Sequence, residues 1–130
     1  MKSRGGRGSG IVEAVTIGVV LIALTLALID LVVIVMANGV NDTAAKNAAR
    51  AAANENTGDG AYAAAQTSVN SLKPAGFVSS LTLSTVDYTP GGVVTCRTKI
   101  EVKLPVPVPG IGATFLFVAQ ATEPILTHTE

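Results

Sequence analysis

The feature that most constrains this chain is a long apolar run near its N-terminus. Between Ala14 and Ala37 there are 24 residues, and Asp30 is the only charged one among them. A helix needs about 20 apolar residues to cross a bilayer whose hydrocarbon core is about 30 Å thick. We therefore expect a membrane-spanning helix, with room in the remainder of the 130 residues for one small domain.

The charges around this run predict its orientation. Lys2, Arg4 and Arg7 precede it with no acid among them. Basic residues beside a single span favour a cytoplasmic N-terminus, so the part after about residue 38 should be exported. A cleaved secretory signal is the alternative, but its apolar region is typically about 7–15 residues and ends in a small-residue cleavage site. The run here is longer, and no such site follows it.

Helical sequence continues beyond the expected membrane boundary. The segment "AAKNAARAAANEN" is rich in alanine, the best helix former, so one helix from about Ile11 to Asn54 would be about 66 Å long. Asn38 and Gly39 are its weak point. There the helix could end, with Asn41 or Asp42 capping a second one, or merely bend.

The rest of the chain predicts a small αβ domain. "NENTGDG" is a break, after which Asp59 could cap a short helix over 61–72 with Tyr62, Ala65, Val69 and Leu72 on one apolar face. From Phe77 the periodicity becomes two, with strands expected in "SLTLSTVDY", "VVTCRTKIEVKL" and "ATFLFVAQATEPI" and a turn at "PGG". Such a small antiparallel sheet needs cover, and the exported helix is the expected cover.

The expected fold class is therefore α+β, divided into four parts. These are a basic leader over 1–8, a transmembrane and polymerisation helix over 9–40, an exported helix continuation over 41–56, and a small exported domain over 57–130. Two finer expectations concern the sheet. Cys96 should be buried on the apolar face of its strand, and "PVPVPGIG" should be an extended connector, because prolines cannot sit in a central strand.

Three segments together resemble a known family. A basic leader ending in glycine, followed by glutamate at the fifth position after it, resembles the class III signal of type IV pilin-like proteins. "RGSGIVEAV", "LALIDLVVIV" and "GVNDTAAKNAARAAA" together are similar to the TadE-like family over about Arg7 to Ala53. The resemblance implies cleavage between Gly8 and Ser9 by a prepilin peptidase, with Glu13 as the pilin-type glutamate and Asp30 as the helix aspartate.

The physical chemistry of the two acids agrees with a role in assembly. Among packed helices Glu13 would be buried and would need a partner, and the α-amine created at Ser9 of a neighbouring subunit is a natural one. Such a pair would select one axial stagger, as buried polar groups do in coiled coils. Asp30 lies about 100° around the helix from Glu13 and so needs a partner of its own. The candidates are a hydroxyl of the Thr16 or Thr25 type on another helix, a cation of an assembly partner, or a protonated state of Asp30 itself, and we favour a contact between helices.

The leading functional hypothesis is a pilin or pseudopilin subunit of a Tad-like (type IVc) pilus or related filament. Its expected partners are the membrane, copies of itself or other pilin-like subunits, the peptidase and the pilus assembly machinery. A membrane-tethered adaptor that binds a partner without polymerising is the alternative. No enzyme or cofactor is expected, because His128 is the only histidine and stands near the chain end. Lys46 and Arg50 are too few to indicate nucleic-acid binding.

Overall fold

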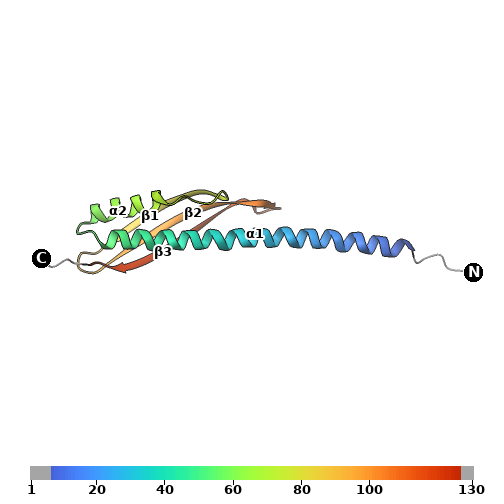
Figure 1. Cartoon of the computed structure of the whole chain (residues 1–130), viewed down its shortest axis with the longest axis horizontal. Helices are drawn as coiled ribbons and strands as arrows, with labels where there is room; N and C mark the ends of the chain where they lie inside the picture. The colour runs from blue at the N-terminus through green and yellow to red at the C-terminus, as the bar shows by residue number, and fades with distance from the viewer. Residues whose placement is uncertain (1–6, 127–130) are drawn as a thin grey trace, which may run out of the picture.

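The computed structural model describes residues 7–126 and has the expected α+β fold. Its elements in chain order are α1 (Arg7–Ala53), α2 (Gly58–Ser71), β1 (Val78–Tyr88), β2 (Val93–Val108) and β3 (Gly112–Pro124). The strands form one antiparallel sheet in the order β1-β2-β3. The C-terminal half of α1 packs on this sheet, and its N-terminal half projects beyond it (Figure 1).

The first helix runs without interruption through Asn38 and Gly39. It has 47 residues, which corresponds to about 70 Å at 1.5 Å per residue. The open question of a break is thereby settled, and neither Asn41 nor Asp42 caps a second helix. One helical glycine costs only about 1 kcal/mol relative to alanine, and the helix continues through Gly39 into the buried alanines that follow it. The helix ends at Ala53, whose carbonyl accepts a hydrogen bond from the Leu126 N–H at 3.1 Å.

The second helix begins earlier than predicted. Its N-cap is Thr57, whose hydroxyl accepts from the Gly60 N–H at 3.1 Å, so the prediction that Asp59 is the cap was wrong. Thr57 has the extended backbone of a cap, whereas Asp59 already lies in the first helical turn. Its buried residues are Ala61, Ala65 and Val69, and Tyr62 is 51% exposed. The prediction that Tyr62 lies on the buried face of the helix was therefore wrong, and the preceding residue, Ala61, is buried instead.

The strands confirm the period-two pattern. Along β2 the exposed side chains include Arg97, Lys99 and Lys103, while Val94, Cys96, Thr98, Ile100, Val102 and Leu104 are buried. The predicted turn at Pro90–Gly92 joins β1 to β2, and Gly91 has a φ of 69°, a left-handed conformation that glycine adopts without strain. One face of the sheet is therefore polar and the other meets the helices.

The prediction for the proline-rich segment was wrong in part. The connector was expected over 105–112, but β2 continues through Pro105 and Pro107 to Val108, and only the residues from Pro109 to Ile111 form the turn. β1 pairs with β2 only as far as Val102, so the prolines lie where β2 no longer has a strand on both sides. The rule that excludes proline from a central strand holds, because this part of β2 is no longer central.

Alanine brings both helices close to the sheet. One cluster joins Val94, Cys96 and Ile125 to the helix residues Ala48, Ala49, Ala52, Ala53, Ala61, Ala65 and Val69. A second cluster, nearer the membrane-type segment, contains Ala37, Val78, Ile100 and Val102. Small side chains allow backbones to approach closely, and the packing confirms that the exported part of the helix covers the sheet.

The buried thiol gives the first testable prediction. Cys96 has no exposed surface, and desolvation, followed by the charge of Asp87, raises its pKa to about 11. A shift of two pH units lowers the thiolate fraction about 100-fold at pH 8. We expect iodoacetamide to alkylate Cys96 at least that much more slowly in folded protein than in urea, as measured by mass spectrometry. Equal rates would contradict the burial.

The same pKa shift has a consequence for stability. The folded state favours the neutral thiol, and this preference contributes to the free energy of unfolding. The contribution is fully present below pH 9, the ordinary thiol pKa, and is lost as the pH rises towards about 11.

Candidate assembly surface

The N-terminal half of α1 is an apolar rod with almost no cover. Its length and composition suffice for crossing a membrane. Its large side chains are more than one-third exposed at the following positions: Ile11, Val12, Val15, Ile17, Val19, Val20, Leu21, Ile22, Leu24, Leu26, Leu28, Ile29, Leu31, Val32, Val35 and Met36. A monomer in water rarely leaves so much contiguous apolar surface exposed, so this surface needs lipid or protein around it.

The residues of the predicted processing site lie at the beginning of this rod. Gly8 and Ser9 are exposed in the first turn of α1, and Glu13 is exposed one turn later. Glu13 makes no side-chain hydrogen bond or ion pair with any of residues 8–126. Residues 1–6 of the predicted leader, with Lys2 and Arg4, lie outside the described residues, as does His128.

Asp30 occupies a different environment from Glu13. The residue is only 7% exposed, although the adjacent residues Ile29 and Leu31 are exposed. Its Oδ1 accepts a hydrogen bond of 3.2 Å from the backbone N–H of Val106, which lies in the distal part of β2. The structure thus provides a partner for Asp30 within its own chain. The predicted contact with another helix stays a prediction.

A second buried polar group on α1 was missed by the sequence reasoning. Asn41 is fully buried; its Nδ2 donates to the Phe117 carbonyl at 3.2 Å, and its Oδ1 accepts from the Thr98 hydroxyl at 2.8 Å. The Thr98 hydroxyl also lies 3.2 Å from the Asn41 main-chain oxygen. Asn41 therefore joins the helix to both β2 and β3.

A positional signal for these two residues was available in the sequence. Asp30 and Asn41 are eleven residues apart, close to three turns of 3.6 residues, so they differ by only about 20° around the helix. Ala37, Ala44 and Ala48 lie within about 40° of the same direction and are fully buried. Asp30 is thus the first member of the stripe that faces the sheet. Glu13, about 100° away and about 26 Å along the axis, is not brought together with it.

The two basic residues of the alanine-rich stretch form ion pairs on the surface. Lys46 Nζ lies 2.6 Å from Asp42 Oδ2 one turn earlier, and Arg50 Nε lies 3.4 Å from Glu123 Oε1 on β3. Both pairs are largely exposed, and such pairs typically contribute less than about 1 kcal/mol. Only the Arg50–Glu123 pair joins α1 to the sheet, and neither pair adds much to the stability of the domain.

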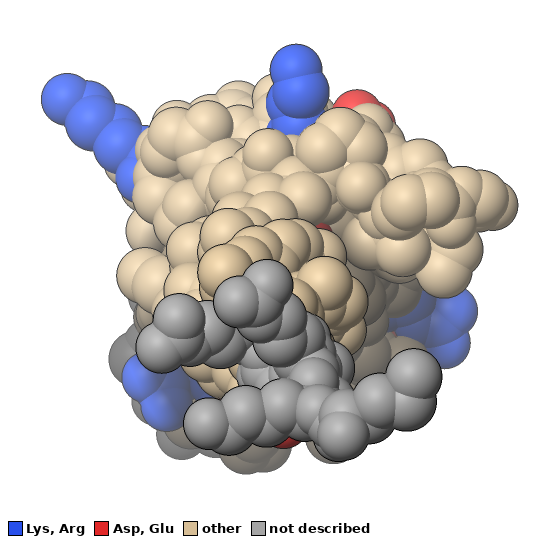
Figure 2. Space-filling view, turned by 90° about the vertical axis from the view of Figure 1, so that its right-hand side faces the viewer, with Lys and Arg blue, Asp and Glu red and all other residues tan. Residues whose placement is uncertain are grey.

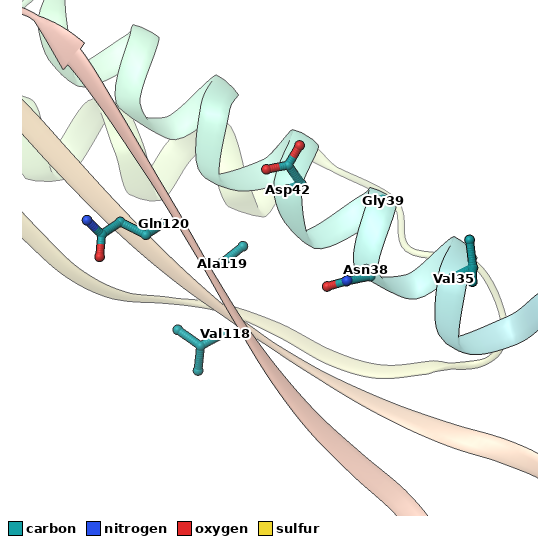
Figure 3. A pocket seen from close by; sticks show the side chains of 7 residues that line it. All are labelled: Val35, Asn38, Gly39, Asp42, Val118, Ala119 and Gln120. Atoms are coloured by element: carbon teal, nitrogen blue, oxygen red, sulfur yellow. The ribbon is translucent and has the colours of Figure 1, made fainter. Parts of the chain in front are cut away.

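A shallow groove separates α1 from β3 beside these pairs. Figure 3 shows its lining: Val35, Asn38, Gly39 and Asp42 from the helix, and Val118, Ala119 and Gln120 from the strand. Asp42 is its only ionisable residue and is already paired with Lys46. Within residues 7–126 no group of three or more histidine, cysteine, aspartate or glutamate side chains is placed to hold a metal ion.

Comparison with known proteins adds no relative: no family model matches the chain, and no curated protein and no solved structure matches it.

Proposed function

We propose that this chain is a structural subunit of a Tad-like (type IVc) pilus or related extracellular filament, as a pilin or pseudopilin. It is inserted first in the membrane through the N-terminal half of α1, with its N-terminus in the cytoplasm and the αβ domain outside. After cleavage by a prepilin peptidase, the same half of α1 packs against copies of itself or other pilin-like subunits within the filament.

The observation that carries this proposal is the unequal cover of the two halves of α1. From Ala37 onwards one face of the helix is buried by the sheet and α2, whereas nearly every large side chain from Ile11 to Met36 is exposed. An exposed apolar rod joined rigidly to a folded head is suited to two environments in turn, lipid and a bundle of similar rods. A simple membrane tether would not need a rigid connection between span and head.

The two acids of the rod support the same proposal in different ways. Asp30 already has a partner within the chain, so burying that part of the rod among other helices leaves it satisfied. Glu13 is exposed and has no partner among the described residues. Burial in a bundle would penalise it unless another subunit supplied a cation, and the Ser9 α-amine released by cleavage after Gly8 has the required charge.

The first test of the proposal is cleavage, and the chain supplies a matched control. Gly8 and Gly10 are both exposed and helical, and a Cβ on either would meet no atom within 4 Å. Replacing either with alanine therefore leaves the fold unchanged. We expect intact-mass spectrometry of the exported protein to begin at Ser9, with Gly8→Ala reducing cleavage and Gly10→Ala having little effect. Retention of Met1 in the wild-type protein would contradict processing.

The second test separates a filament subunit from a membrane-tethered adaptor. Cells that express the chain are sheared, and the released material is examined by electron microscopy and by immunoblotting for this protein. Filaments that contain the cleaved chain support the proposal. A cleaved chain that remains in the membrane fraction and enters no filament favours the adaptor instead.

A further inference from the structure

We propose that the turn end of the β2–β3 hairpin, residues 104–113, inserts into the outer leaflet of the bilayer beside α1 while the subunit is in the membrane. We refer to this segment as the hairpin tip. The inference rests on α1 crossing a membrane, as proposed above, and extends it by adding a second lipid contact. In this arrangement the surface of the hairpin tip contacts the acyl chains of phospholipid.

The hydrogen bond to Asp30 determines the level of the hairpin tip along α1. Val106 donates to Asp30 at 3.2 Å, and Asp30 stands seven residues before Ala37, the end of the apolar run. At 1.5 Å per residue, this contact lies about 10 Å inside that run. The turn beyond Val106 extends further alongside the bare part of α1 (Figure 1). A bilayer that covers α1 from Ala14 to Ala37 therefore reaches the tip as well.

The composition of the hairpin fits this position. No charged residue occurs from Leu104 to Thr122. The side chains at the tip are almost entirely apolar, and Ile111 at the turn is 68% exposed, so water rather than protein surrounds it in the isolated chain. Burying such a side chain in lipid is favourable, because it removes apolar surface from water.

Lipid also demands that backbone N–H groups have partners, and half of the ten positions of the tip meet this demand by a bond or by having no N–H. Pro105, Pro107 and Pro109 have no N–H at all. The Val106 N–H is bonded to Asp30, and the Ile111 N–H donates to the Val108 carbonyl at 3.1 Å.

Two of the prolines lie along the edge of β2 that has no neighbouring strand to accept hydrogen bonds from its N–H groups. The Lys103 N–H still donates to Phe77 on the β1 side at 2.9 Å, but β1 pairs no further along β2. In a regular strand every second N–H points to the same edge, which places Pro105 and Pro107 along the edge that β1 has left. An aqueous strand would tolerate N–H groups there, whereas a strand in lipid would not.

Basic side chains lie where the phospholipid headgroups would be. Lys103, immediately before the tip, and Lys73, in the loop after α2, are both exposed, and Lys73 lines a hollow together with Met36 near the end of the apolar run. Viewed from the N-terminal end of α1, Lys and Arg side chains project at the rim around a mostly uncharged face (Figure 2). Cations at this level favour an anionic leaflet.

The test places an environment-sensitive NBD fluorophore at single cysteines in the full chain, reconstituted in phosphatidylcholine–phosphatidylglycerol vesicles. Cys96→Ala removes the native thiol, and the labelled positions are Ile111→Cys at the tip, Leu24→Cys on the exposed surface of α1 and Thr122→Cys at the other end of β3. Two kinds of quencher are compared, namely phosphatidylcholine with a doxyl group on its acyl chain, placed high on the chain for position 111 and low on it for position 24, and aqueous iodide.

We expect the doxyl lipid to reduce fluorescence about twofold at positions 111 and 24, as for groups buried about 5–10 Å into the interface or deeper. Iodide should quench only at position 122. Lipid quenching at 24 with iodide quenching at 111 would overturn the tip insertion and leave the membrane span intact. Iodide quenching at 24 would overturn the span itself. Protection of position 111 from both quenchers would mean cover by another protein copy, which also overturns the inference.

Discussion

Replacing Glu13 with alanine is expected to abolish incorporation of this chain into filaments while leaving its membrane insertion and fold unchanged. The side chain is exposed and makes no hydrogen bond or ion pair with residues 8–126, so we expect the fold of the isolated subunit to be unaffected. In a helical bundle the substitution would leave the neighbouring Ser9 α-amine buried without its anion. Breaking one member of a buried ion pair costs about 3–5 kcal/mol, and this penalty would recur at every subunit.

The measurement is the amount of this chain in sheared filaments relative to the membrane fraction, by immunoblotting. Asp59→Ala serves as the control, because Asp59 is an exposed acid on α2, remote from the apolar rod. We expect at least a hundredfold loss for Glu13→Ala, as a penalty of this size implies, and a normal yield for Asp59→Ala. Normal filaments from Glu13→Ala would refute the ion pair with Ser9.

Replacing Asn41 with leucine should give the largest loss of stability in the exported domain. Leucine has a similar size and favours a helix, but it leaves the Phe117 carbonyl without its 3.2 Å donor and the Thr98 hydroxyl without its 2.8 Å acceptor. Thr98 retains only the longer contact to the main-chain oxygen of residue 41. Buried groups left unsatisfied cost about 1–3 kcal/mol each, so we expect a loss of about 2–4 kcal/mol.

The free energy of unfolding is measured by pulse proteolysis of the full chain in urea and a mild detergent. Asn38→Leu is the matched control, since Asn38 stands nearly one turn earlier on the same helix and is exposed. Exposed substitutions usually change stability by less than about 0.5 kcal/mol. An equal effect of both substitutions would show that the hydrogen bonds of Asn41 do not stabilise the domain.

Much of the fold could be predicted because it depends on local patterns. The alanine-rich stretch and the alternation along β2 each bury their side chains on one face wherever the partner lies. The apolar run is recognisable from its length and composition alone. The glycine turn at Pro90–Gly92 is equally local. Two of the errors were local competitions between neighbours: Thr57 was the cap rather than Asp59, and Ala61 was buried rather than Tyr62.

The candidate site was predicted less completely than the fold. Gly8, Ser9 and Glu13 were singled out by the resemblance to pilin-like signals, and the structure locates them on an exposed helix start. The functions predicted for them stay predictions, because they need a peptidase or another subunit. The partner of Asp30 and the role of Asn41 were not predicted, although both residues are in phase with the alanine face.

The sequence by itself determined where the apolar rod lies, which residues alternate in the sheet, and that one face of the helix after Ala37 is made for close contact. Only the tertiary structure decided that the hairpin returns along the rod. There it brings Val106 to Asp30 and Phe117 to Asn41, each 76 residues away in the chain. Periodicity reports which side of an element is buried. It does not report which distant backbone group arrives there, because that depends on the length and bending of strands that pair elsewhere.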